Sequence, residues 1–136
     1  GNAGTILRTA DAMGMSAIIT SPDSVDMYSP KVVRSTAGSL WHIPVFEGIS
    51  FERVDKQLTG IQKLLLSSHA TTSILNLKIP SDCIAIFGNE ARGVDVASLG
   101  ATVTEVTIPM AGRAESLNLS AAASIVMFTL SSKVAG

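Results

Sequence analysis

The spacing of apolar residues predicts a series of helices along the chain. Near the N-terminus, Ile6, Ala10 and Met13 share one helical face, and Gly14 is a typical residue for ending a helix. A second helix is expected to begin at Pro30, because proline is favoured in the first turn. In the middle of the chain, apolar residues recur at steps of three and four and predict one amphipathic helix from Ser50, with its apolar face formed by Phe51, Val54, Leu58, Ile61, Leu64 and Leu65.

Predicted strands alternate with these helices. A last helix is indicated by apolar residues at helical spacing from Leu119 to Leu130. Alternating strands and helices are typical of an α/β fold with a mainly parallel sheet and helices on both faces. The segments expected to be strands are Ser16–Thr20, His42–Val45, Thr71–Ile79, Cys83–Phe87 and Val103–Ile108.

Length and composition narrow the possible functions. The 136 residues, 46% of them hydrophobic and 15% charged, predict one compact domain over residues 1–136. The net charge of −1 argues against a broad basic surface, so any contact with nucleic acid must be local or supplied by another domain or subunit. Because Cys83 is the single cysteine, no intrachain disulfide can form, and a reducing intracellular compartment fits best.

Other classes of site lack their sequence signatures. The two histidines stand apart from each other and from Cys83, so no metal site is expected, and the apolar runs are too short for a membrane span. Neither G-x-G-x-x-G nor G-K-[ST] occurs, which argues against the usual nucleotide sites.

His42, beside Trp41, is interpreted as a packed or surface histidine. The chain starts at Gly1 without methionine, so we expect that further residues precede it.

Two junctions between a strand and a loop could hold a ligand. After residues 103–108, Pro109 ends the strand, and a loop of small polar residues leads into the last helix. Unpaired backbone groups beside a helix N-terminus suit a polar small molecule. On spacing alone, Ser116 would cap this helix and Asn118 would lie in its first turn. At the second junction, Gly88 follows a buried strand and would let a ligand approach the backbone.

Four further polar residues each have an ordinary structural interpretation. Asn2 is a candidate N-cap, and Arg8 lies opposite the apolar stripe of its helix, where a solvated arginine is ordinary. Glu90 could cap the helix that follows it. Arg92 could contact phosphate, but a surface ion pair explains it as well.

Three ordered motifs resemble those of the SpoU-type RNA 2′-O-ribose methyltransferases of the SPOUT superfamily. They are N-x-G-x-x-x-R-T-A at residues 2–10, G-N-E-x-x-G at 88–93 and IPMAGRAESLNLS at 108–120. The segment SPKVVRSTAGSLWHIPV, residues 29–45, extends the resemblance. The end of the last helix, residues 128–132, departs from the family because it lacks the Tyr, Arg and Gln common in relatives.

The resemblance implies a fold, a methyl donor and a substrate. The family has a deep trefoil knot at the C-terminal part of the domain, and S-adenosyl-L-methionine binds bent among the loops of the second and third motifs. Enzymes of the family transfer a methyl group from this donor to a ribose 2′-hydroxyl of rRNA or tRNA. A first strand and often a separate RNA-binding domain lie upstream of the point at which this chain begins. The residues expected at the donor are Phe87, Gly88, Asn89, Ile108, Met110, Leu117 and Asn118.

The resemblance also assigns residues to catalysis. A guanidinium is always protonated, so we expect Arg8 to hold a phosphate and stabilise the developing alkoxide, and the general base stays unassigned. Other residues would position the hydroxyl or relay its proton. The set expected to act in catalysis is Asn2, Arg8, Glu90, Ser116 and Asn118.

The last helix is also expected to form a homodimer. Residues 121–130 are apolar nearly all round, and one face, with Ile125 and Phe128, would remain exposed after the other packs on the sheet. The family implies the same, with an active site near the subunit boundary. The expected partners are structured RNA and a second copy of the chain, and neither DNA nor a membrane is expected as a partner. The expected location is the cytoplasm or an organelle. Two alternatives stay open: a knotted RNA-binding scaffold that has lost transfer, and an unrelated α/β enzyme.

Overall fold

A computed structural model describes residues 2–79, 82–88 and 103–135. These residues fall into two compact units, Gly1–Thr59 and Gly60–Gly136. Every strand pairing in the described part of the chain is parallel, in a two-stranded sheet of order β1-β2 and a three-stranded sheet of order β4-β3-β5. The prediction of an α/β fold with parallel pairing is therefore confirmed.

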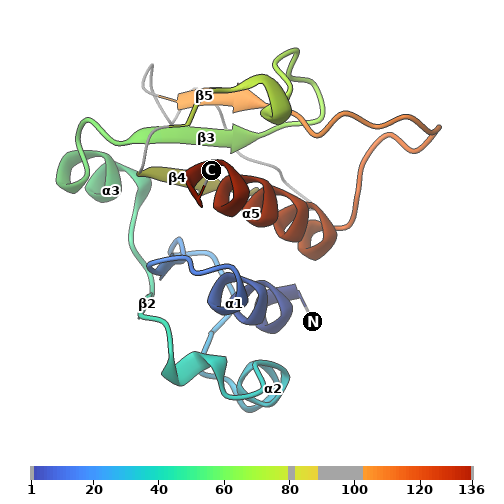
Figure 1. Ribbon diagram of the computed structural model, residues 1–136. Coiled ribbons are helices and arrows are strands. Elements are labelled where there is room, and N and C mark those ends of the chain that lie inside the picture. The colour runs from blue at the N-terminus through green and yellow to red at the C-terminus, as the bar shows by residue number, and fades with distance from the viewer. Residues whose placement is uncertain (1, 80–81, 89–102, 136) are drawn as a thin grey trace. The chain divides into compact units, whose positions relative to one another are not determined.

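The first unit combines short helices with the two-stranded sheet (Figure 1). Its strands pair in the register Ile18↔Val45 and Ile19↔Phe46. The predicted helix start at Pro30 is confirmed, because Pro30 is the first residue of a helix whose N-cap, Ser29, accepts a hydrogen bond from the Val32 N–H. The elements are helices α1 (Asn2–Ala12), α2 (Pro30–Ser35) and α3 (Phe51–Gln57), the 3-10 helix η1 (Ser39–Trp41), and strands β1 (Ile18–Ile19) and β2 (Val45–Phe46).

Helices α1 and α2 pack closely because Gly4 has no side chain. A Cβ at Gly4 would collide with the side chain of Ser35. The buried face of α1 consists of Gly4, Leu7 and Ala10. The predicted face is therefore rotated, since Ile6 is only partly buried. The chain leaves the helix at Gly14, whose φ of 74° is accessible to glycine at little cost, as the sequence predicted.

The second unit is a parallel sheet covered by a long helix. Strands β3 (Gln62–Leu66), β4 (Cys83–Ile86) and β5 (Val103–Val106) form the sheet, with β3 in the centre. Its core contains Leu64 and Val106 from the sheet, Ile74 from the 3-10 helix η2 (Ile74–Asn76), and Val126 and Leu130 from helix α5 (Leu119–Ala135). This packing fixes the start of α5 near the ends of the strands (Figure 1).

The prediction of one helix across residues 50–65 is wrong in its second half. Helix α3 ends at Gln57, Gly60 has a φ of 85°, and residues 62–66 form the central strand β3. A strand buried in a parallel sheet is hydrophobic without alternation, so the Leu64, Leu65 and Leu66 run suits a strand as well as a helix. Only the pairing of residues 62–66 with β4 and β5 shows that they form a strand and not a helix.

The prediction of a strand at Thr71–Ile79 is also wrong. Residues 74–76 form η2, whose N-cap Ser73 accepts a hydrogen bond from the Leu75 N–H. The one trace of sheet here is a parallel bridge between Ser73 and Thr107. Ile74 enters the core from this turn of helix and not from a strand.

Candidate functional site

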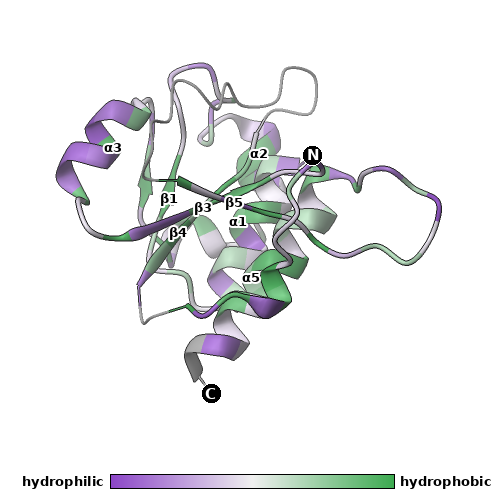
Figure 2. Cartoon of the chain, turned by 90° about the horizontal axis from the view of Figure 1, so that it is seen from above, coloured by the Kyte–Doolittle hydropathy of each residue, from purple (hydrophilic) through white to green (hydrophobic). Residues whose placement is uncertain are grey.

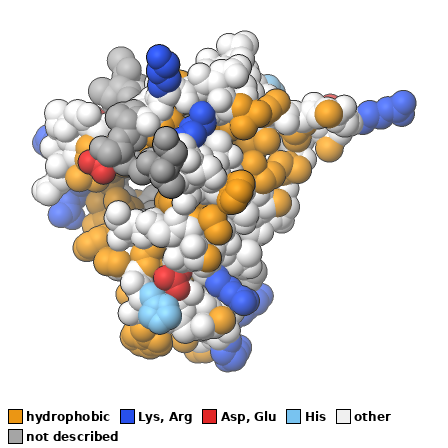
Figure 3. All heavy atoms as spheres, in the orientation of Figure 1, with side chains coloured by type: hydrophobic (Ala, Val, Ile, Leu, Met, Phe, Trp, Pro, Cys, Tyr) orange, Lys and Arg blue, Asp and Glu red, His pale blue; other side chains and the backbone are white. Residues whose placement is uncertain are grey.

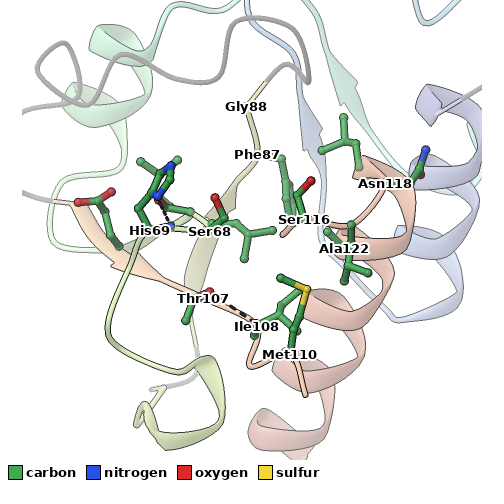
Figure 4. A pocket seen from close by; sticks show the side chains of 16 residues that line it. Ser68, His69, Phe87, Gly88, Thr107, Ile108, Met110, Ser116, Asn118 and Ala122 are labelled. Carbon is green, nitrogen blue, oxygen red and sulfur yellow. Dashed lines mark hydrogen bonds between the residues drawn. The ribbon is translucent and has the colours of Figure 1, made fainter. Parts of the chain in front are cut away.

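The carboxyl ends of β3, β4 and β5 surround a cavity of about 790 Å³ in the second unit (Figure 4). Parallel strands direct their carboxyl ends to one edge of the sheet, where α/β proteins commonly bind ligands. The volume lies within the usual range of roughly 300–1,000 Å³ for small-molecule pockets. The cavity is lined by Leu65, Leu66, Ser67, Ser68, His69, Phe87, Gly88, Glu105, Thr107, Ile108, Met110, Ser116, Leu117, Asn118, Leu119 and Ala122.

Strand β4 ends at the cavity with Phe87 and Gly88. The strand itself was predicted from the buried run that starts at Cys83, and both residues after it line the cavity. The pKa of the Cys83 thiol is raised, first because burial disfavours the thiolate and second because Asp82 is nearby. A thiol in that state is a poor nucleophile, so Cys83 is a packing residue of β4.

The loop between β5 and α5 forms the opposite wall. Ile108, Met110, Ser116 and Leu117 all line the cavity, and Met110 and Leu117 remain 37% and 38% exposed. In Figure 4 the side chain of Met110 projects beside Ile108 and Ala122. The wall therefore offers apolar surface together with the backbone of an irregular loop.

Asn118, and not Ser116, caps helix α5. The Asn118 Oδ1 accepts hydrogen bonds from the Ser120 N–H at 2.9 Å and the Ala121 N–H at 3.4 Å. It also accepts one from the Ser120 hydroxyl at 2.6 Å. The expectation that Ser116 caps the helix is wrong by two positions, because the helix begins at Leu119. Ser116 is left exposed on the cavity wall, free of the capping role.

The sequence interpretation missed the third wall of the cavity. Ser67, Ser68 and His69 follow β3 directly, and the His69 N–H donates to the Ser67 hydroxyl at 3.2 Å. Glu105 of β5 adds a carboxylate to the lining. The polar run SSHATTS immediately after three leucines was the available signal, and assigning those leucines to a helix concealed it.

The remaining predicted site residues lie in the first unit or outside the described residues. Asn2 is the first residue of α1 and is half-buried, and Arg8 is exposed on the same helix, both in the first unit. Asn89, Glu90 and Arg92 lie outside the described residues.

His42 is a surface residue, which is one of the two positions, packed or exposed, that the sequence allowed. Its side chain is 66% exposed, and its Nδ1 lies 2.9 Å from Asp11 Oδ2 at the end of α1. Within residues 2–79, 82–88 and 103–135, no group of His, Cys, Asp and Glu side chains could hold a metal ion. None of the helices in those residues is long and apolar enough to cross a membrane.

Comparison with known proteins connects this geometry to a family. A family model described as the SpoU rRNA Methylase family matches residues 1–128. An uncharacterized tRNA/rRNA methyltransferase of Synechocystis is 36% identical over 130 residues, which are 94% of this chain and 47% of that protein. The Bacillus subtilis 23S rRNA (guanosine(2553)-2′-O)-methyltransferase RlmP is 34% identical over 131 residues, which are 96% of this chain and 53% of RlmP.

A solved structure agrees with the sequence match. The SpoU methyltransferase AviRb from Streptomyces viridochromogenes, in complex with the cofactor AdoMet, superposes with a TM-score of 0.89 at 30% identity. The match covers 99% of this chain and 56% of AviRb. The chain spans about half the length of the curated relatives it matches. Because the family model covers nearly every residue and these relatives match along almost the whole chain, the chain belongs to the SpoU rRNA methylase family.

Proposed function

We propose that this chain is the catalytic domain of an RNA 2′-O-ribose methyltransferase that uses S-adenosyl-L-methionine. The observation that carries the proposal is the cavity at the carboxyl ends of β3, β4 and β5. Six of the seven residues expected at the donor line it: Phe87, Gly88, Ile108, Met110, Leu117 and Asn118. The seventh, Asn89, lies outside the described residues.

The chemistry of the cavity fits this donor, which has an aromatic adenine, ribose hydroxyls and a zwitterionic amino acid end. Phe87, Ile108, Met110 and Leu117 supply apolar surface for a flat heterocycle. Within the described residues, the backbone of Met110 and of Leu117 forms no hydrogen bond to the rest of the chain. Those groups are available to hold adenine, and Ser68 and Glu105 offer polar contacts for hydroxyl or amino groups.

When bound, the donor would supply an electrophilic methyl group for the ribose 2′-oxygen and leave as S-adenosyl-L-homocysteine, and the hydroxyl proton would pass to a general base that stays unassigned. The protein must hold the 2′-oxygen in line with this methyl group and stabilise its developing negative charge. Arg8, an exposed and permanently charged side chain on α1, is proposed to hold phosphate and to provide that stabilisation. Asn2, Glu90 and Ser116 are proposed to position the hydroxyl or relay its proton.

Asn118 has two roles in this proposal. Its Oδ1 already accepts three hydrogen bonds at the start of α5, so its side chain is held in place by the helix. In this position it fixes the end of the loop that carries Ser116 and Leu117. Its contribution to catalysis is therefore proposed to act chiefly through the position of those two residues.

The finer architecture is proposed on the resemblance to the family. Residues 1–136 would form one domain with a mainly parallel sheet, helices on both faces and a deep trefoil knot. The chain would act in the cytoplasm or an organelle, on rRNA or tRNA. A homodimer through α5 is supported by its exposed apolar side chains, since Ile125 is 41% and Phe128 62% exposed. Hydrophobic side chains gather over α5, and α5 is largely apolar along its length (Figures 2 and 3).

Two measurements test the proposed activity. Isothermal titration of S-adenosyl-L-methionine into the chain should give saturable binding at one site. Incubation with methyl-labelled donor and rRNA or tRNA should place the label on ribose 2′-oxygens, detected as nucleotides resistant to alkaline hydrolysis. Donor binding without transfer to either RNA would favour the inactive scaffold, and absence of donor binding would refute the proposal.

A further inference from the structure

Helices α1 and α2 carry three exposed cations. Arg8 lies on α1, and Lys31 and Arg34 lie one turn apart on α2. The ion pairs between described residues are His42–Asp11 and Lys56–Glu52, so none of the three cations is paired with a carboxylate in that part of the chain. Figure 3 shows Lys and Arg side chains gathered over these two helices. Their charges are available to a partner.

The position of these cations can be described relative to the contact at which α1 and α2 pack. Gly4 of α1 lies against Ser35 of α2. Arg8 is four residues after Gly4 and therefore on the same side of α1. Lys31 is four residues before Ser35 and therefore on the same side of α2, and Arg34 directly precedes Ser35. We call the Gly4–Ser35 contact the α1–α2 seam: Arg8 and Lys31 lie on the sides of their helices that carry it, and Arg34 is one residue away from it in sequence.

The two helices carry one carboxylate, and it has a partner. Asp11, the one acidic residue of α1 and α2, is bonded to His42. Asp26, which precedes α2, accepts the Tyr28 N–H at 2.8 Å. Helix α3 differs, because its two cations, Arg53 and Lys56, are matched there by Glu52 and Asp55. The α1–α2 seam is therefore a local positive surface on a chain whose net charge is −1.

An exposed aromatic side chain lies in η1, in the same unit as α1 and α2. Trp41, in η1, is 77% exposed, although tryptophan is usually largely buried. The next residue, His42, is held to Asp11 at the end of α1 by the 2.9 Å contact. The backbone at Trp41 is thus held close to Asp11, which lies three residues beyond Arg8 in α1. Cations beside an exposed aromatic ring are the combination that binds unpaired RNA, in which phosphates meet the charges and a base stacks on the ring.

We propose that α1, α2 and η1 form a binding surface for a single-stranded RNA segment. Arg8, Lys31 and Arg34 contact its phosphates, and Trp41 stacks on an unpaired base. The inference rests on the proposed function, which already assigns Arg8 to RNA, and adds Lys31, Arg34 and Trp41 to the contacts. It explains how a nearly neutral chain could bind RNA, because the positive charge is concentrated at one seam.

The single tryptophan makes the first test direct. Titration of the chain with a single-stranded oligouridine should quench Trp41 fluorescence in a saturable way, and added salt should reverse it. The double variant Lys31→Gln/Arg34→Gln should lower the slope of log affinity against log salt by about 1.4, at about 0.7 per phosphate contact. The charge-matched control Arg53→Gln/Lys56→Gln, on α3, should keep the slope. Equal slopes for the two double variants would overturn the proposal.

The second test isolates the stacking contact. With a fluorescently labelled oligouridine, Trp41→Ala should weaken binding by about 5- to 150-fold, and Trp41→Phe should retain most of it. Trp41→Ala with unchanged RNA affinity but altered sedimentation would overturn the proposal and mark this face as a protein interface. All these variants should bind S-adenosyl-L-methionine as the unmodified chain does. Loss of donor binding in the unmodified chain would count against the methyltransferase function, and the RNA surface would still be judged by the oligouridine results.

Discussion

His42 Nδ1 lies 2.9 Å from Asp11 Oδ2 and joins the residue after η1 to the end of α1. Asp11 and His42 are 31 residues apart in sequence. The segment from Ser35 to His42 therefore contacts α1 at both of its ends: Ser35 packs on Gly4, and His42 bonds to Asp11. Because Arg8 lies between Gly4 and Asp11, the helix that presents this arginine is held at both ends.

This contact predicts a dependence of stability on pH. Hydrogen bonds from His42 and then Ser39 hold the pKa of Asp11 below its usual value of 3.8. A carboxylate with a lowered folded-state pKa stabilises the fold above its unfolded pKa, and this contribution is lost as pH falls through the folded pKa. Asp11→Asn should therefore lower the melting temperature at neutral pH, and the difference should shrink in strong acid.

Thermal melts from neutral pH to strong acid would measure this difference. Asp23→Asn is the control, because Asp23 is an exposed aspartate of the same unit. A difference between Asp11→Asn and the unmodified chain that stays constant across the whole range would show that the charge of Asp11 does not matter.

Gly88→Val should abolish binding of S-adenosyl-L-methionine and leave the fold intact. Gly88 lines the cavity just after β4, so branched bulk there would occupy space proposed for the donor. Gly112→Val is the matched control, since Gly112 does not line the cavity and a Cβ there would meet nothing within 4 Å. Calorimetric titration of both variants measures the effect. Unchanged affinity of Gly88→Val would exclude the proposed pocket.

Arg8→Ala should separate transfer from donor binding. Arg8 is exposed on α1 and is not among the residues expected at the donor, so donor affinity should stay within a few-fold. Loss of an oriented charge that stabilises the transition state should slow methyl transfer by about two or more orders of magnitude. Single-turnover assays with labelled donor measure the rate. Arg53→Ala is the control, because Arg53 is an exposed arginine of α3. Equal transfer rates for the two variants would show that Arg8 has no role in catalysis.

Asn118→Ala should destabilise the fold by about 1 kcal/mol, because it removes the cap of α5. Asn118→Ser should restore most of this stability, since serine is also a strong N-cap. Denaturant unfolding measures both variants. If Asn118 acts only as the cap, methyl transfer should recover with stability in Asn118→Ser. Full stability with transfer still lost would instead give its amide a direct role in catalysis.

Phe128→Glu should dissociate the proposed homodimer. Phe128 is 62% exposed on α5, and a carboxylate there could not be buried in an apolar interface without a large desolvation cost. Sedimentation velocity measures the change. Ser132→Glu, an exposed position on the same helix, is the control for added charge. A monomeric unmodified chain at micromolar concentration would refute the dimer directly.

Much of the site was predictable because its signals are local. Proline and glycine end strands and helices through their own backbone preferences, so Pro109, Gly88 and Gly14 marked junctions without reference to the rest of the fold. Two of those junctions line the cavity, with the residues that the motifs indicated. The choice between Ser116 and Asn118 as the cap was also local, but it depends on where α5 begins, and helix ends are poorly fixed by periodicity.

The sequence by itself determined the parallel α/β class, most of the apolar face of α5, the two junctions that line the cavity and the membership of the family. Only the tertiary structure decided that Leu64 and Leu65 lie in the central strand, because their spacing fits a helix and a buried parallel strand equally well. That decision brought Ser67, Ser68 and His69 to the cavity. Strand pairing is a contact between residues far apart in sequence, so no local pattern encodes which loop it will place at the carboxyl edge of the sheet.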